Sequence, residues 1–286
     1  MQHKLSDWFL YFFIFSLGAI IGSFLNVVIH RIPRRESIVF PNSRCPHCKN
    51  PVKPYDNIPI ISWLVLKGKC RGCKNPISPR YIIVESVTAS LFLVAFLKLG
   101  LSPFLLPALV LICATIALIF IDAEHMILPN VITYPMIIVA LISRILFALF
   151  FADNFFSDLK YFPAEQISHY PVWFSSLLSG IFGSLVGGGF LWITGQLWEK
   201  LRKIEAMGMG DVKMMAGVGA FLGWRLTLLT IFIGAFTGAL AGIGIAWRKG
   251  SLQTQIPFGI FLGIGTIISL LFGEELIRLY LDLFMP

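Results

Sequence analysis

The sequence has few charged residues, and acids are especially scarce. Only 13% of the 286 residues are charged, and 15 are Asp or Glu, whereas a soluble domain carries roughly 25% charged residues. Together with 57% hydrophobic residues, this shortage excludes a soluble globular protein and predicts a membrane protein with several spans. The net charge of +8 would favour nucleic acid in a soluble protein, but in a membrane protein it is typical of basic cytoplasmic loops. We therefore expect no nucleic-acid partner.

Two further absences narrow the class of protein. No small-x-small cleavage site follows the first apolar stretch, which is long and contains Asn26, so this stretch is not predicted to be a cleaved signal peptide. No Gly-x-Gly-x-x-Gly motif follows a predicted strand, so the sequence indicates no Rossmann cofactor site.

Apolar runs of about 20 residues predict membrane-spanning helices. The sixth run is short and could be tilted, re-entrant or buried among its neighbours, so seven spans remain an alternative to eight. We expect an all-α polytopic membrane protein with about eight transmembrane helices. The predicted spans are 8–30, 81–99, 103–121, 131–151, 173–197, 212–223, 226–247 and 257–281.

The distribution of Lys and Arg predicts the orientation, because cytoplasmic loops carry an excess of both. With an even number of spans, the segment 31–80 shares one side with loops 122–130, 198–213 and 248–256. That side holds 17 of the 23 Lys and Arg residues, the opposite side holds five, and Arg144 lies inside a span. We expect the basic side to face the cytoplasm.

The chain is thus predicted to have three parts: a first transmembrane helix, 1–30, a polar, proline-rich cytoplasmic insertion, 31–80, and a transmembrane bundle, 81–286. Within the bundle, glycines recur at a spacing of four residues, which lets helices approach closely and indicates packing. They are Gly183 and Gly187, followed by Gly234, Gly238 and Gly242.

The insertion contains two C-x-x-C pairs, Cys45 with Cys48 and Cys70 with Cys73, separated by 21 residues. Two such turns can close a tetrahedral four-thiolate zinc site. A disulfide is disfavoured because the cytosol is reducing. His47 could compete as a ligand, but four thiolates fill the shell. We therefore predict a structural Zn²⁺ in the insertion. The fifth cysteine, Cys113, is predicted to be an apolar packing residue within a span.

Two aspartates are predicted at the cytoplasmic membrane face. Asp122 follows the third span, and Asp211 precedes the sixth within Gly-Met-Gly-Asp, 89 residues later. They could simply end one helix and cap another. They could also form a pair, since two neighbouring carboxylates cannot both ionise easily and one keeps a proton. Gly208 and Gly210 would then allow a peptide substrate to approach.

A third acid, Glu85, lies about one turn inside the second predicted span. An acid at that depth is a candidate functional residue, and the alternative is a snorkelling or paired side chain. Together with Asp122 and Asp211 it could form the relay of a proton-coupled membrane transporter. A non-catalytic, zinc-anchored scaffold is the remaining alternative.

At these residues the sequence resembles the type IV prepilin peptidases, the bifunctional leader peptidase and N-methyltransferase family. Five motifs occur in the family's order and cover most of the chain. They are GSFLNVVIHRIP (22–33), the two C-x-x-C pairs with NIPIISWL between them and CRGCKNPISPRYIIVESVTA continuing through Glu85, DAEHMILPN (122–130), GMGDVK (208–213) and IPFGIFLGIG (256–265).

The resemblance implies a GxGD-type aspartic peptidase of the bacterial inner membrane, with its active site and zinc loop facing the cytoplasm. It would remove the basic leader of type IV prepilins or type II secretion pseudopilins, and the substrate would be a membrane helix. Asp122 and Asp211 match the catalytic aspartates, carried by the bundle 81–286. The four cysteines match the zinc loop of the bifunctional members.

The resemblance also implies N-methylation of the new N-terminus with S-adenosylmethionine. Glu36, Asp56 and Glu85 could contribute to that site, and chemistry does not rank them. If the leader docks near the active site, the available acids are Glu124, Glu205 and the two aspartates.

Overall fold

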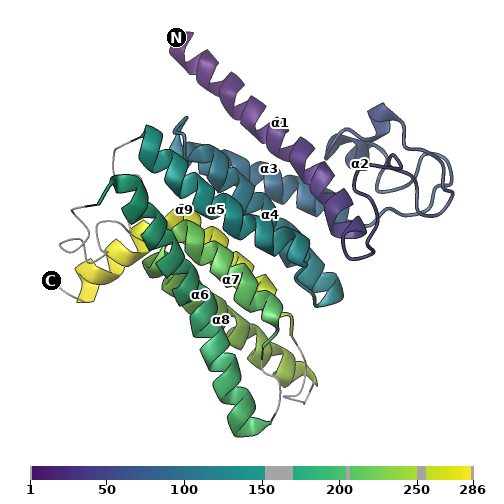
Figure 1. Cartoon of the computed structure of the whole chain (residues 1–286). Coiled ribbons are helices and arrows are strands. Elements are labelled where there is room, and N and C mark those ends of the chain that lie inside the picture. The colour runs from purple at the N-terminus through teal and green to yellow at the C-terminus, as the bar shows by residue number, and fades with distance from the viewer. Residues whose placement is uncertain (1, 152–169, 204–206, 250–255, 285–286) are drawn as a thin grey trace. The chain divides into compact units, whose positions relative to one another are not determined.

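The structure is a computed structural model of the chain and describes residues 2–151, 170–203, 207–249 and 256–284 (Figure 1). Within these ranges the chain is helical and forms no named strand, as the sequence predicts. The helices are α1 (Gln2–Arg31), the short 3-10 helix η1 (Pro54–Asp56), α2 (Ile61–Val65), α3 (Arg80–Leu99), α4 (Leu105–His125), α5 (Asn130–Phe150), α6 (Val172–Arg202), α7 (Met209–Leu222), α8 (Trp224–Lys249) and α9 (Phe258–Phe284).

Seven helices of the described ranges are long and apolar enough to cross a membrane: α1, α3, α4, α5, α6, α8 and α9. The short sixth run of the sequence corresponds to α7, which has 14 residues. At 1.5 Å per residue it is about 21 Å long, less than the roughly 30 Å hydrocarbon core. Nine of its 14 residues are buried, so α7 is the buried alternative that the sequence analysis considered.

The chain divides into two compact units, 1–105 and 106–286. In the first unit α1 and α3 pack along each other. Gly18 and Gly22 lie at this contact, because a Cβ added to either would lie 2.8 Å from the Cα of Ala89 or Glu85, respectively. The insertion between the two helices carries η1 and α2. Two glycines four residues apart therefore allow the backbones of the first unit to approach closely.

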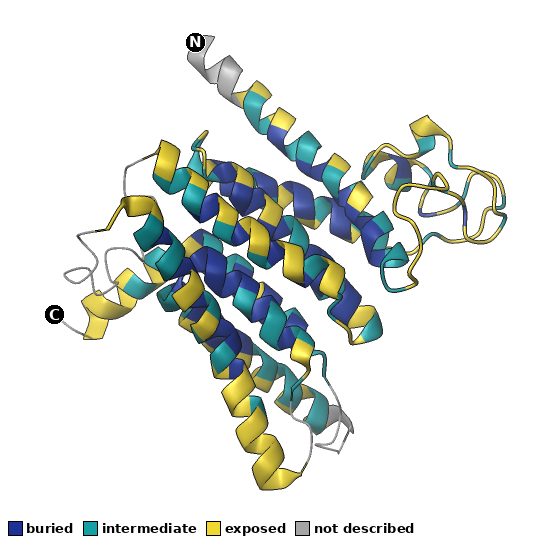
Figure 2. Cartoon of the chain, in the orientation of Figure 1, coloured by how far each residue is buried: buried dark blue, intermediate teal, exposed yellow. Residues whose placement is uncertain are grey.

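In the second unit α7 contacts α5, α6, α8 and α9, and it carries much of the buried interior that Figure 2 shows. Gly183 and Gly219 each place their backbone against the other's carbonyl, and Gly187 packs against the carbonyl of Met215. This confirms that Gly183 and Gly187 serve packing, since any side chain at either position would enter the backbone of α7.

The later glycines pack α8 against α9. A Cβ at Gly234 would lie 3.0 Å from Leu262, and one at Gly238 would lie 3.4 Å from Phe261. Gly242 is less crowded, with 3.6 Å to Ile256. The contact is tight at Gly234 and loosens toward Gly242.

Arg144 of α5 binds the C-terminal end of α7. Its side chain is fully buried and donates from Nε to the carbonyl of Ala220 at 2.6 Å and from Nη2 to that of Phe221 at 3.2 Å. Gly180 leaves room for it, because a Cβ there would lie 2.6 Å from Arg144 Cδ. The last carbonyls of a helix have no partner within the helix and attract a cation. Arg144, which the sequence only places inside a span, thus provides hydrogen-bond partners for the last carbonyls of α7.

Candidate active site

Asp122 lies in the last turn of α4, with 5% of its surface exposed. Its carboxylate faces the backbone amides of Gly259 and Ile260 in the first turn of α9. A Cβ added to Gly259 would lie 2.7 Å from Asp122 Oδ2, so only glycine fits between them. Among the described residues Oδ2 has no partner that meets hydrogen-bond geometry. The start of α9 thus offers a positive dipole end to a buried carboxylate that keeps one oxygen unpaired.

Asp211 lies in the first turn of α7, with 8% of its surface exposed. Gly208 is the N-cap, and Asp211 is the third helical residue, whose carboxylate interacts with the Gly208 amide. This arrangement corresponds to the reach-back half of a capping box. The aspartate therefore does support the helix start, as the simpler interpretation of the sequence proposed, and it remains buried while it does so.

The charge of Asp122 acts on the carboxyl of Asp211. Asp211 is in α7, outside the seven candidate spans. Burial raises the pKa of its carboxyl to about 7, and the negative charge of Asp122 adds to this increase. Two carboxylates that disfavour each other's charge tend to hold one proton between them. The negative charge of Asp122 therefore contributes to the proton affinity of Asp211 within the second unit.

Leu128 explains how the two positions come together. It follows α4 in the segment that leads to α5. A Cβ added to Gly210 would lie 2.8 Å from Leu128 Cβ, and one added to Gly259 would lie 3.2 Å from Leu128 Cδ1. Gly210 of α7 and Gly259 of α9 therefore contact the same side chain. The second glycine of Gly-Met-Gly-Asp is required by this contact.

The neighbouring charged residues are directed elsewhere. Lys213 donates from Nζ to Asn130 Oδ1 at 2.9 Å and lies 5.3 Å from the centre of the Tyr134 ring. Glu124 is exposed, with a carboxylate oxygen 4.0 Å from His125. Glu205, which the sequence analysis considered as an attractor for a leader, lies outside the described residues.

The four predicted cysteines meet in the insertion of the first unit. The sulfurs of Cys45, Cys48, Cys70 and Cys73 lie within 4.8 Å of one another, and none forms a disulfide. The Sγ atoms of Cys45 and Cys73 are 3.8 Å apart. Two thiolates 2.3 Å from a tetrahedral zinc ion are about 3.8 Å apart. The residues therefore fit a zinc ion, while His47 is exposed and lies outside the cluster.

Each cysteine pair is held by the same local backbone structure. The amide of Cys45 donates to the Asn50 carbonyl at 3.0 Å, and the amide of Cys70 donates to the Asn75 carbonyl at 2.9 Å. In the second pair the amides of Cys73 and Gly72 lower the pKa of the Cys70 thiol to about 7. A thiolate is the form that binds metal, so the loop favours the ligating state of this cysteine.

The three candidates for a methyl-donor site have different environments in the first unit. Glu36 is exposed. Asp56 is held by Arg71, whose Nη2 lies 2.7 Å from Oδ1, and this contact lowers the pKa of the Asp56 carboxyl. Glu85 is buried, and its Oε2 accepts from the amide of Ile60 at 2.7 Å. Glu85 therefore links α3 to the insertion, a contact that the sequence alone does not indicate.

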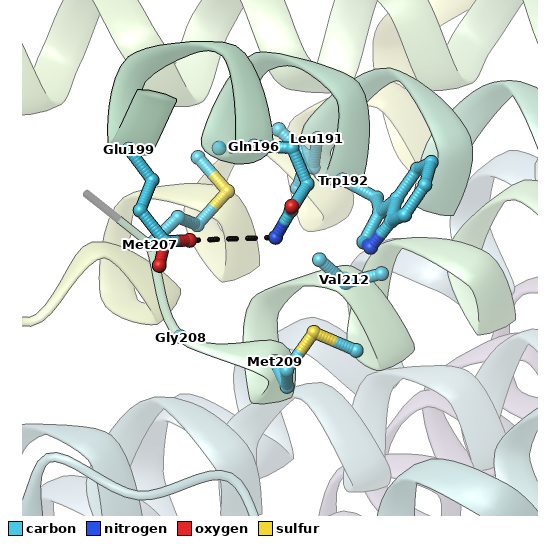
Figure 3. Close-up of a pocket in the computed structure, with 9 residues that line it drawn as sticks. Leu191, Trp192, Gln196, Glu199, Met207, Gly208, Met209 and Val212 are labelled. Carbon is cyan, nitrogen blue, oxygen red and sulfur yellow. Dashed lines mark hydrogen bonds between the residues drawn. The ribbon is translucent and has the colours of Figure 1, made fainter. Parts of the chain in front are cut away.

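A pocket of about 260 Å³ is lined in part by Gly208 and Met209, which precede Asp211 in the chain. Figure 3 shows it between the second half of α6, which contributes Trp192, Gln196 and Glu199, and the start of α7, which contributes Gly208 and Met209. Trp192, Met209 and Glu199 are exposed side chains, so the pocket is open to the surroundings. The pocket therefore lies next to the start of the Gly-Met-Gly-Asp turn.

Two contacts were not found by reasoning from the sequence, one at the site and one at the opposite end of α7. Gly259 of α9 accommodates Asp122 of α4. The sequence feature that could have indicated this contact is the spacing of four residues between Gly259 and Gly263, because Gly263 packs against Ile119, which is also in α4. Arg144 had a weaker signal, namely a charge within an apolar run.

The chain is similar to known proteins over nearly its whole length. Residues 16–99 match the family model of the bacterial peptidase A24 N-terminal domain, and residues 109–243 match that of the type IV leader peptidase family. Relatives named prepilin leader peptidase/N-methyltransferase are 34% identical in Aeromonas hydrophila (97% of this chain and 96% of the relative), 34% in Pseudomonas aeruginosa (93% and 91%) and 35% in Dichelobacter nodosus (94% of each). No solved structure matches the chain significantly.

Proposed function

Since the chain belongs to the type IV leader peptidase family, we propose that it removes the leader of prepilins or type II secretion pseudopilins with Asp122 and Asp211 as its catalytic pair. The observation that carries this assignment is that two buried carboxylates, Asp122 of α4 and Asp211 of α7, adjoin two glycines, Gly259 and Gly210, that contact the same Leu128 side chain. Family membership supports the reaction and does not favour a proton-coupled transporter or a non-catalytic scaffold.

The environments of the two carboxylates suggest their roles. Asp122 faces the amides at the start of α9, which favour a negative charge, so it acts as the base. Asp211 holds the proton, because burial and the charge of Asp122 raise the pKa of its carboxyl to about 7. Asp122 takes a proton from water as the water oxygen bonds to the scissile carbonyl carbon, and Asp211 gives its proton to the carbonyl oxygen.

Collapse of the tetrahedral intermediate restores the pair. The carbon–nitrogen bond breaks while Asp122 gives its proton to the leaving nitrogen, and a hydroxyl of the intermediate returns a proton to Asp211. Each aspartate ends in its starting state, so no further reactant beyond water is required. The cleaved chain leaves as a carboxylic acid and a free amine.

The setting of the pair suits a substrate that is itself a membrane helix. Asp122 ends the apolar helix α4, so its side chain lies near the end of a candidate span. From the positive-inside distribution of Lys and Arg we infer that this end lies at the cytoplasmic face of the inner membrane. A leader on the cytoplasmic side would then present its junction with the substrate helix to Asp122 and Asp211.

The zinc-binding cluster has a structural role in this proposal. Four thiolates close the coordination shell of a tetrahedral Zn²⁺ and leave no open position for a substrate. The insertion has few buried residues of its own, although Cys45 is buried. The ion would therefore hold the two cysteine turns together, and the chemistry of cleavage stays with Asp122 and Asp211.

The second reaction, N-methylation of the new N-terminus, uses S-adenosylmethionine as the methyl donor. We place that donor's site in the first unit, near Glu85. Asn26 supports this placement, because its Oδ1 is buried and has no hydrogen-bond partner among the described residues, while its Nδ2 donates to the Tyr81 carbonyl at 3.1 Å. Glu85 and Asn26 would accept hydrogen bonds from the amino and hydroxyl groups of the donor. Glu36 and Asp56 are the weaker candidates, one exposed and the other bound by Arg71.

One incubation tests both activities. Purified protein is mixed with a prepilin and radiolabelled S-adenosylmethionine, and the products are followed by mass and by label. The proposal expects loss of the leader and one methyl group on the new N-terminus. An intact prepilin after incubation with folded, zinc-loaded protein would refute the peptidase, whereas cleavage without label transfer would refute only the methyltransferase.

A further inference from the structure

The pocket at Gly208 and Met209 has walls suited to a long basic side chain. Trp192 and Met209 provide an aromatic and a thioether surface, and Glu199 provides a carboxylate. Lys and Arg cover apolar surface with their aliphatic stems while the charged group reaches a polar partner. An aromatic face also attracts a cation. These walls offer each of the three contacts that such a side chain uses.

The position of the pocket ties its occupant to the catalytic pair. Gly208 lines the pocket, and a Cβ added there would lie 3.6 Å from Asp211 Oδ2. Gly208 therefore both lines the pocket and lies next to the Asp211 carboxylate. For a peptide that is being cleaved at Asp211, this places a side chain close to the scissile bond.

The charge of the pocket favours a cation despite its basic surroundings. Glu199 is the one charged residue among those that line the pocket, and it accepts from Gln196 Nε2 at 3.4 Å, the contact drawn in Figure 3. This contact is long, so a stronger donor can replace it. Arg202 follows on α6, but its guanidinium lies 5.5 Å from the centre of the Trp198 ring.

We propose that this α6–α7 pocket, lined by Trp192, Glu199, Gly208 and Met209, binds a Lys or Arg side chain of the leader close to the cleaved bond. The inference rests on the proposed peptidase function and adds a specificity site to it. Glu199 recognises the charge, Trp192 and Met209 hold the stem, and Gly208 sets the distance to Asp211. The pocket selects substrates and takes no part in proton transfer.

A double-mutant cycle tests the charge contact. Glu199→Gln is compared with wild type on two substrates, a prepilin with basic leader residues and the same prepilin with those residues changed to Gln. We expect Glu199→Gln to raise KM about 3–10-fold for the basic leader, the range of an exposed ion pair supported by an aromatic ring, with kcat unchanged. For the neutral leader we expect no change in KM.

Asp282→Asn is the matched charge control, since Asp282 is an exposed acid of the same unit and lines no part of the pocket. If Glu199→Gln raises KM equally for both leaders, or for neither, the proposed charge contact is wrong. The peptidase assignment survives that result as long as wild-type protein cleaves the prepilin. A wild-type protein that cleaves neither substrate refutes the proposed function itself.

A second variant tests whether the substrate side chain occupies the volume of the pocket, and this test does not depend on the charge of Glu199. Gly195 lines the pocket, and a Cβ there would lie 3.7 Å from Met207, so Gly195→Leu fills the hollow. Gly189→Leu is the control on the same helix, because a Cβ at that position meets no described atom within 4 Å. We expect Gly195→Leu to raise KM for the basic leader at least about 10-fold and to remove its advantage over the neutral one. Equal selectivity in the two Leu variants would overturn the proposal.

Discussion

Replacing Arg144 with Met is expected to destabilise the second unit through the end of α7. The guanidinium donates to the carbonyls of Ala220 at 2.6 Å, Phe221 at 3.2 Å and Ser176 at 3.4 Å. Hydrogen bonds between helices in membranes contribute about 0.6 kcal/mol on average and about 1.7 kcal/mol at most. Two good bonds and one long one therefore amount to about 2–4 kcal/mol of unfolding free energy.

Two further variants separate the charge from the shape. Arg144→Lys keeps a cation but has one ammonium group for carbonyls of two helices, so we expect a smaller loss, about 1–2 kcal/mol. Arg225→Met is the control, since Arg225 Nη1 lies 3.9 Å from Glu274 Oε1 at a partly exposed site, and such pairs contribute about 0–1 kcal/mol.

The assay is equilibrium unfolding in mixed micelles, with the fraction of denaturing detergent as the variable and tryptophan fluorescence as the signal. Cleavage of a prepilin is measured on the same samples below the transition. Because α7 also carries Asp211, we expect Arg144→Met to lower kcat before the unit unfolds. An Arg144→Met protein with wild-type stability would refute the claim that Arg144 stabilises α7.

Three further outcomes are expected. Gly259→Ala should reduce cleavage at least about 10-fold with zinc retained, because its Cβ would lie 2.7 Å from Asp122 Oδ2 and displace the base; unchanged kinetics would contradict that contact. The kcat/KM of cleavage should fall as the pH rises above about 7, because the acid form of Asp211 is lost at that pKa; a flat profile to pH 9 would contradict the role of Asp211 as acid. Elemental analysis should find one zinc per chain in protein purified without chelator, and Cys73→Ser should lose it; wild-type protein without zinc would remove the metal claim.

The pH profile of stability follows from the same carboxyl group. A folded-state pKa of about 7 for Asp211 lies above the usual 3.8, so the folded protein binds this proton more tightly than the unfolded chain does. The resulting stability is fully present at acid pH and is lost as the pH rises from about 4 to 7. Asp211→Asn should make the free energy of unfolding nearly independent of pH between about 4 and 7.

The sequence predicted features that depend on composition and local spacing. Apolar runs gave the spans, and the C-x-x-C spacing gave the four cysteines that the structure brings within 4.8 Å. The short sixth run was counted among about eight spans, with a buried helix as one alternative, because its 12 residues are fewer than the roughly 20 that a span needs. Asp122 and Asp211 were paired by counting spans, an argument that fixes membrane depth and leaves distance open.

Contacts between distant segments could not be predicted in this way. Arg144 and Ala220 are 76 residues apart, and Ile60 and Glu85 are 25 apart. Periodicity shows that a residue lies on a helix, but its partner depends on how two helices cross. Gly259 illustrates the same limit, since its motif was noted as a resemblance while its contact with Asp122 emerged only from the packing of α4 against α9.

The central claim is that Asp122 and Asp211 act together, and the most direct measurement is prepilin cleavage by Asp122→Asn and Asp211→Asn. Each amide keeps the shape of the side chain but cannot exchange the proton. We predict that either change lowers kcat by about 10²–10⁴-fold or more, that the double variant is no slower than the slower single variant, and that zinc content and the activity of the Asp282→Asn control stay at wild-type levels. Cleavage at the wild-type rate by either folded asparagine variant would contradict the paired-aspartate mechanism.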